Sequence, residues 1–213
     1  MISAVEFKKD ISKTLGSGLR SMGFKGSGFR FSMESDDFAF VIGIQASQYG
    51  GHCYIEFGIQ PKALTIVNGQ TIDMAKIKYF ECEFRMRLRN EDNSDQWAYA
   101  VSRELNQQIA HSIIEAITKQ VTPIISKFKE KPFILDEIEV GDLANNYKNI
   151  PAKLGGMGVM TGEIRLAWAL TKLFGKSNPE KAKQFAAFGL SKLGTTNLFF
   201  GRIDFENALA MQY

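Results

Sequence analysis

The chain has 213 residues, of which 45% are hydrophobic and 12% aromatic, and this is enough to build a substantial core. Its 26 Lys and Arg against 23 Asp and Glu leave a formal net charge of +3. That balance lacks the concentrated basic surface of nucleic-acid-binding proteins. With two Cys and two His, the composition excludes a disulfide framework and disfavours a structural zinc site.

The first residues contain no apolar stretch behind a basic start, which a secretory signal would need. No run approaches the roughly 18 apolar residues that a membrane-spanning helix requires. We therefore expect a cytoplasmic protein with both thiols free and no membrane partner. No motif of a metal site or a cofactor site is present, so we expect neither.

Residues 3–22 predict an amphipathic helix, with Ser3 as its N-cap and Gly23 as a left-handed C-cap glycine. The stretch GLRSMGFKGSGFRF, residues 18–31, raises the alternative of a phosphate-binding loop. A P-loop needs Lys where this chain has Phe24, and a dinucleotide-binding loop opens a helix, whereas these glycines end one. The sequence therefore favours a turn and a helix cap.

After this turn the period of apolar residues changes from that of a helix to two, which predicts strands. The second of these strands is apolar on both faces, as expected for a central strand. The others each have one polar face. The four predicted strands cover residues 29–32, 38–47, 53–60 and 79–89.

A long helix is predicted over residues 95–129, with Trp97 near its start and Pro123 ending or kinking it. A loop-rich stretch follows it over residues 130–160. The glycines of that stretch, "GGMG", lack the spacing of a known phosphate loop and favour a flexible linker. Two shorter helices then close the chain, over residues 162–174 and 179–193.

The fold class expected from these elements is α+β. It is a four-stranded, mostly antiparallel sheet packed on an N-terminal helix and a long helix, with a small α-helical C-terminal extension. We expect two parts, an α+β core domain over residues 1–129 and a helical extension over residues 130–213 that packs on the core.

Charged side chains alternate along two of the predicted strands and should project from one face of the sheet. Carboxylates in pairs can serve as acid and base, and an arginine can hold a carboxylate or phosphate through two hydrogen bonds. Cross-strand ion pairs on a solvated face are the alternative. The side chains concerned are Glu56, Glu81, Glu83, Arg85 and Arg87.

A second group of polar residues lies where the second strand ends and its turn begins, a frequent place for recognition. A plain hairpin loop is the alternative there. From the two groups we predict a set of binding residues and assign no catalytic residue. The predicted binding residues are Gln45, Ser47, Tyr49, Glu56, Glu83, Arg85 and Arg87.

The two cysteines, Cys53 and Cys82, both fall on the apolar side of their strands. Buried cysteines usually pack as small hydrophobic residues and are inert. We therefore predict that neither is a nucleophile.

Five short motifs together resemble one family. They are Gly23-Phe24-Lys25, Gln45-x-Ser47-x-Tyr49-Gly50, Ile55-Glu56-Phe57-Gly58-Ile59, Cys82-x-x-Arg85-x-Arg87-Leu88 and Asp95-x-Trp97. In this order they are similar to the bacterial family called domain of unknown function 4304, over roughly residues 6–128. The resemblance implies an α+β fold and a bacterial cytoplasmic setting. It implies no activity, cofactor or partner.

Three functions remain open on the sequence. The first is a non-catalytic module that binds an unidentified protein or peptide, for which an immunity role against a toxin would fit. The second is an enzyme acting on a small anionic substrate at the polar face of the sheet. Nucleic-acid binding is the third and the least favoured, because Phe80, Phe84 and Leu88 alternate away from the arginines and toward the predicted core.

Overall fold

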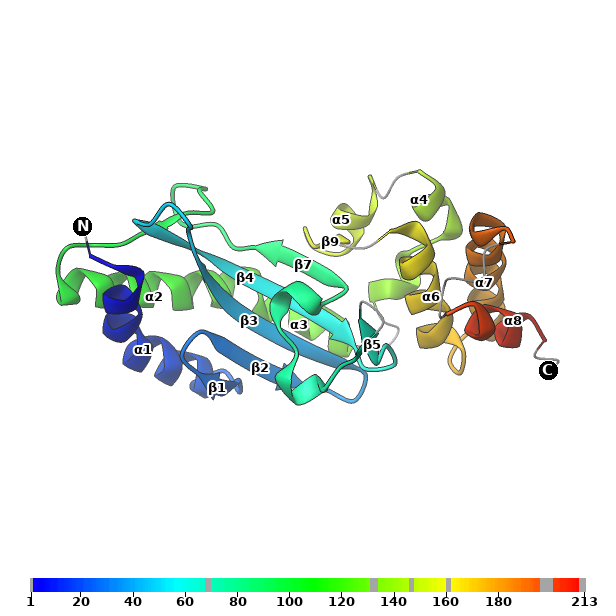
Figure 1. Cartoon of the computed structure of the whole chain (residues 1–213), viewed down its shortest axis with the longest axis horizontal. Helices are drawn as coiled ribbons and strands as arrows, with labels where there is room; N and C mark the ends of the chain where they lie inside the picture. Colours follow the sequence, from blue (N-terminus) through cyan, green and yellow to red (C-terminus); the bar gives the residue numbers. More distant parts are fainter. Residues whose placement is uncertain are drawn as a thin grey trace.

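A computed structural model describes residues 2–67, 70–130, 134–145, 148–159, 162–195 and 201–210 of the chain. At its centre lies an antiparallel sheet in the strand order β1-β2-β3-β4-β7-β9, with β8 paired to β4 (Figure 1). The α+β class is confirmed, and the sheet has more strands than the four predicted. The strands are β1 (Lys25–Ser27), β2 (Arg30–Glu34), β3 (Phe38–Ala46), β4 (His52–Pro61), β7 (Phe84–Arg87), β8 (Trp97–Ala98) and β9 (Gly158–Val159).

Helices cover one face of this sheet, and further helices gather at one end of the molecule (Figure 1). The covering helices are α1 (Ala4–Ser21), α2 (Arg103–Gln120) and α3 (Thr122–Lys129). Later in the chain come η3 (Ile134–Glu137), α4 (Val140–Ala144), α5 (Ile150–Lys153), α6 (Glu163–Phe174), α7 (Pro179–Leu193) and α8 (Arg202–Ala210). In the part of the chain that the structure describes, no helix is both long and apolar enough to cross a membrane.

The glycine-rich stretch after α1 is a helix cap followed by a hairpin. Gly23 has a φ of 91°, and its N–H donates to the carbonyl of Arg20 at 3.0 Å. The N–H of Phe24 donates to the carbonyl of Leu19 at 3.0 Å. These two bonds form a Schellman motif, which satisfies the last carbonyls of the helix. The cap interpretation is confirmed.

The prediction of a fourth strand over residues 79–89 is wrong for its first residues. Residues Tyr79–Glu81 form the 3₁₀ helix η2, and the strand is confined to β7. Two glycines on neighbouring strands explain the difference, because they let η2 lie close against the sheet. A Cβ on Gly43 would lie 2.2 Å from Cδ1 of Tyr79, and one on Gly58 would lie 2.7 Å from Sγ of Cys82.

The long helix begins later than the predicted residue 95. Trp97 belongs to β8 and pairs with Cys53 of β4, so its buried side chain faces the helix-covered core. The N–H of Leu105 donates to the Ser102 hydroxyl at 3.3 Å, which caps α2. The break at Pro123 is confirmed, because this residue lies in the first turn of α3.

The second glycine cluster does not form the linker that the sequence predicts. Gly155 and Gly156 have positive φ angles just after α5, and the next residues form β9. Val159 of β9 pairs with Phe84 of β7, so a segment of the predicted extension completes the sheet edge. The predicted helices 162–174 and 179–193 correspond to α6 and α7. The division of the chain into two domains near residue 130 stays a prediction.

Candidate functional site

The polar face of the sheet contains an open pocket of about 600 Å³, which we call the sheet pocket. Its floor comes from β3, β4 and β7, and η2 supplies one wall. The residues that line it are Gln45, Glu56, Tyr79, Phe80, Arg85, Met86 and Arg87.

Strand register brings the charged side chains of the sheet pocket together. Arg87 of β7 lies directly opposite Glu56 of β4, and Arg85 lies opposite Gly58. Residues two apart on a strand point to the same face, so both arginines project on the side of Glu56. Because Gly58 has no side chain, Cys82 and the end of η2 can approach the sheet at this point.

Arg87 is held in place by several partners. Its Nε donates to Oε1 of Glu56 at 2.7 Å, and its Nη1 donates to Oδ2 of Asp95 at 3.3 Å. The guanidinium also lies over the ring of Tyr54, 4.2 Å from its centre. Partial burial opposes charge here, but the hydrogen bond and the charge of Glu56 outweigh it and raise the pKa of Arg87. Arg87 and Glu56 thus form a fixed ion pair on the pocket floor.

Arg85 is different, since it forms no hydrogen bond and no ion pair with any residue that the structure describes. Its Nε is buried and lacks an acceptor. A buried donor left without a partner costs about 1–3 kcal/mol, and more when the group is charged. Of the two arginines in the pocket, Arg85 is therefore the one with unused hydrogen-bonding capacity for an anion.

Tyr79 links η2 to the sheet across the pocket. Its hydroxyl donates to the side-chain oxygen of Gln45 at 3.1 Å. Burial, and then the charge of Glu56, raise the pKa of the Tyr79 phenol. The phenol therefore stays protonated as a hydrogen-bond donor, and the amide nitrogen of Gln45 has no partner among the described residues.

Four residues of the predicted polar groups lie outside the sheet pocket. Ser47 and Tyr49 belong to the turn after β3, where the Ser47 hydroxyl accepts from the Tyr49 N–H at 3.2 Å and the Tyr49 side chain is 87% exposed. Glu83 is buried, and its Oε2 lies 2.8 Å from Nε of Arg165. The fourth, Glu81, caps η2 by accepting from the N–H of Lys78 at 2.7 Å. The polar residues that the structure does bring together are Gln45, Glu56, Arg85 and Arg87.

The aromatic wall of the pocket does not follow from the pattern of the sequence. Phe80 was predicted to face the core, but it is 52% exposed and lies beside Tyr79, with their ring centres 5.4 Å apart and the rings nearly perpendicular. The error follows from the 3₁₀ helix, which replaces strand alternation at these residues. The signal that could have indicated it is the presence of Gly43 and Gly58 on adjacent strands, since glycine inside a strand marks close approach by another backbone.

The two cysteines lie inside the fold rather than at its surface. Both are free and buried. Burial raises the pKa of the Cys53 thiol to about 12 and raises that of Cys82 as well. Because the reactive form of cysteine is the thiolate, burial of this kind disfavours it, and the absence of a nucleophilic role stays a prediction. Over the described ranges, no cluster of three or more His, Cys, Asp or Glu could hold a metal ion.

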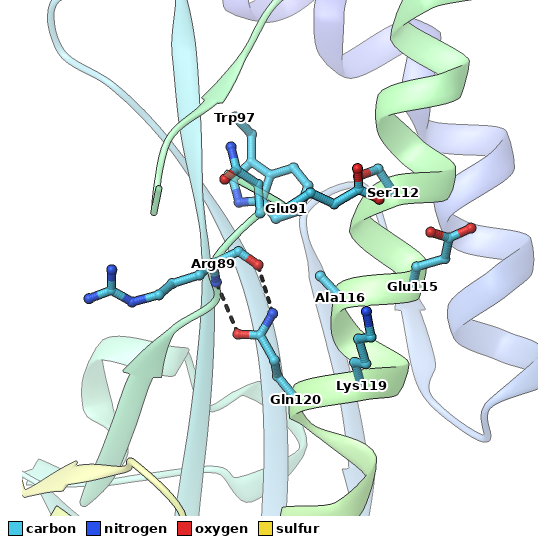
Figure 2. Close-up of a pocket in the computed structure, with 9 residues that line it drawn as sticks. Arg89, Glu91, Trp97, Ser112, Glu115, Ala116, Lys119 and Gln120 are labelled. Carbon is cyan, nitrogen blue, oxygen red and sulfur yellow. Dashed lines mark hydrogen bonds between the residues drawn. The ribbon is translucent and has the colours of Figure 1, made fainter. Parts of the chain in front are cut away.

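A second, much smaller pocket of about 80 Å³ lies between α2 and the segment after β7 (Figure 2). Figure 2 shows how Gln120 of α2 holds the backbone of Arg89, accepting from its N–H at 3.0 Å and donating to its carbonyl at 2.7 Å. The Gln120 amide thus makes the two backbone hydrogen bonds that a neighbouring strand would make, and it holds the backbone in place just after β7. A volume of this size holds only a few water molecules, so we do not take this pocket as the site.

Comparison with known proteins gives one match. A family model described as Domain of unknown function (DUF4304) matches residues 15–127. No curated protein matches, and no solved structure matches. The matched segment includes β3, β4 and β7, and with them every residue that lines the sheet pocket.

Proposed function

We propose that this chain, which belongs to the family described as Domain of unknown function (DUF4304), is a recognition module that binds a protein or peptide in the sheet pocket. The observation that carries the proposal is the form of the pocket, a wide depression on a sheet face with a half-exposed aromatic ring in its wall. Sites for small molecules enclose most of the ligand surface. An open pocket with an exposed ring suits a group inserted by a larger partner, because aromatic residues often supply much of the binding energy of interfaces.

The state of the acidic and basic groups favours recognition over catalysis. Glu56 and Glu83, the carboxylates that the enzyme alternative would place in the site, are each ion-paired with an arginine. A carboxylate oxygen that already accepts a hydrogen bond from an arginine is less free to accept a proton from a substrate. The Tyr79 phenol, with its raised pKa, is likewise suited to donating a hydrogen bond rather than to transferring a proton at neutral pH.

An enzyme acting on a small anionic substrate is the second candidate. The observation in its favour is that Glu56, Tyr79 and Arg85 line one pocket. The two candidates differ in the fate of the ligand, since a recognition module returns its ligand unchanged. Mass spectrometry of the bound molecule after incubation with the full chain separates them.

A peptide-display selection on the full chain tests the proposal. We would screen random peptides displayed with free C-termini and, in parallel, with both ends blocked. Enriched peptides should bind wild type and lose about tenfold or more in affinity to Phe80→Ala, because a ring at an interface contributes over 1 kcal/mol. Val101→Ala is the control, since Val101 is an exposed apolar residue outside the sheet pocket.

Two results would overturn the proposal. One is that no peptide is enriched from either library. The other is that enriched peptides bind Phe80→Ala and Gln45→Ala as tightly as wild type, which would place their site elsewhere on the chain.

A further inference from the structure

We infer that the group bound in the sheet pocket is the C-terminal carboxylate of a peptide ending in an apolar residue, and that Arg85 is its anchor. This inference rests on the proposed function and adds the chemistry of the ligand. Three features of the pocket support it: unused hydrogen-bond donors, net charge and the position of the aromatic wall.

The hydrogen-bonding groups left free in the pocket are mainly donors. Arg85 has no acceptor among the described residues, and its Nε is buried. The Gln45 oxygen already accepts from Tyr79 at 3.1 Å, which leaves the amide nitrogen of Gln45 as a donor. On the opposite strand, Oε1 of Glu56 already accepts from Arg87 at 2.7 Å. The ligand that complements such a site is one that mainly accepts hydrogen bonds, as an anion does.

Net charge selects among anions. Arg87 is already paired with Glu56 and Asp95, whereas Arg85 has no acidic partner among the described residues and presents one positive charge to a ligand. A carboxylate carries one negative charge, and its two oxygens match the planar fork of a guanidinium. A phosphate monoester carries closer to two negative charges near neutral pH, and the second would lie near Glu56. The pocket is therefore matched to a carboxylate.

The aromatic wall indicates where this carboxylate comes from. Phe80 and Tyr79 line the same pocket as Arg85, so an anion held at Arg85 lies near exposed ring surface. At a peptide C-terminus the carboxylate and the last side chain branch from one Cα, which places an apolar group beside the anion. Asp or Glu within a chain holds its carboxylate away from neighbouring side chains. A chain end with an apolar last residue therefore fits both features.

NMR titration of the full chain with three N-acetylated peptides tests the inference. They are acetyl-Ala-Ala-Leu with a free carboxylate, the same peptide as its C-terminal amide, and acetyl-Ala-Glu-Ala amide. We expect the free acid to bind at least about tenfold more tightly than the other two, because a charged hydrogen bond contributes about 1.5–3 kcal/mol. The Arg85 Nε–H signal should shift with the free acid.

Arg85→Gln should remove the preference for acid over amide, and Arg85→Lys should retain part of it, since Lys keeps the charge without the fork. Arg103→Gln is the matched control, because Arg103 is an exposed arginine at the start of α2 and lies outside the sheet pocket. Far-UV circular dichroism and urea unfolding of Arg85→Gln show whether the variant is folded, and the acid and amide peptides on wild type give an answer that needs no variant.

Equal binding of acid and amide, tighter binding of the internal Glu peptide, or tighter binding of inorganic phosphate would each overturn the inference. These failures are separable from failure of the proposed function. Display-selected peptides that depend on Phe80 but not on Arg85 would leave the recognition module standing and remove the carboxylate anchor. If the free-acid peptide binds at Arg85 but display enriches no peptide, the carboxylate anchor would stand and the recognition module would be removed.

Discussion

The two faces of the central sheet are covered by different means, although the same strands form both. On one face, large side chains such as Phe57 and Ile55 belong to the same buried core as Phe7 and Ile11 of α1. On the other face, small residues such as Ala39 lie under Ile77 and Cys82, in the segment that contains the two 3₁₀ helices η1 (Met74–Lys76) and η2. In Figure 1 this segment crosses the side of the sheet away from α1 and α2.

The difference explains where the sheet pocket lies. Helices bury a broad surface because each presents a continuous apolar stripe. A short segment with 3₁₀ turns covers only the strands directly below it, here through contacts at Gly43 and Gly58. The sheet surface beyond its edge stays open and polar, and Arg85 lies at that boundary. The predictions below test whether the two faces differ in stability as well as in packing.

Substitutions on the two faces should differ in cost, and this is the largest effect we expect. Phe57→Ala should lower the free energy of unfolding by about 3–5 kcal/mol, because it leaves a cavity in the helix-covered core. Gly43→Ala should cost about 1–3 kcal/mol, because the added methyl meets Tyr79, which can move with η2. Urea unfolding measures both. An equal loss for the two variants would show that the two faces are equally rigid, and a greater loss for Gly43→Ala would reverse the comparison.

Cys53 and Cys82 report separately on the two faces, since Cys53 belongs to the helix-covered core and Cys82 to the cluster under η2. Burial raises the pKa of both thiols, so labelling near pH 8 requires local opening. Opening of the small cluster should need less free energy than unfolding of the core. In single-cysteine variants, Cys82 should therefore react at least about tenfold faster than Cys53.

Labelling of the two thiols with a chromogenic disulfide reagent at several urea concentrations measures this difference. The matched variants are Cys53→Ala, which reports on Cys82, and Cys82→Ala, which reports on Cys53. Equal rates with the same urea dependence would mean that both faces open only in global unfolding.

Removal of the Tyr79 hydroxyl should have the smallest effect. Tyr79→Phe deletes the hydrogen bond to Gln45 and should cost about 0.5–1 kcal/mol, because this bond is near solvent. The ring and its contact with Phe80 remain. Thermal or urea unfolding gives the value. A loss of about 3 kcal/mol or more would mean that this bond fixes η2 on the sheet, beyond the usual worth of one hydrogen bond.

The parts of the fold that the sequence predicts well depend on local signals. Ser3 and Gly23 mark the ends of α1, and Asn178 caps α7 by accepting from the N–H of Lys181 at 3.2 Å. The parts that it predicts badly depend on contacts between distant residues. Trp97 is in a strand because β4 lies beside it, and Tyr79 is in a 3₁₀ turn because Gly43 lies below it.

The candidate site divides in the same way. Gln45, Glu56, Arg85 and Arg87 could be placed on one face from strand alternation alone. The sequence could not predict that Arg87 is paired and that Arg85 is unpaired. This difference depends on which partner reaches each guanidinium.

The pairing of β9 with β7 has a consequence for synthesis of the chain on the ribosome. Val159 follows Phe84 by 75 positions, so β7 emerges long before the strand that covers its outer edge. Until then β7 is an uncovered edge, which in other sheets invites pairing with another chain. The family-matched segment ends at residue 127, before β9. A fragment cut to that boundary would keep the sheet pocket but expose the β7 edge, and the full chain is the better material for work in solution.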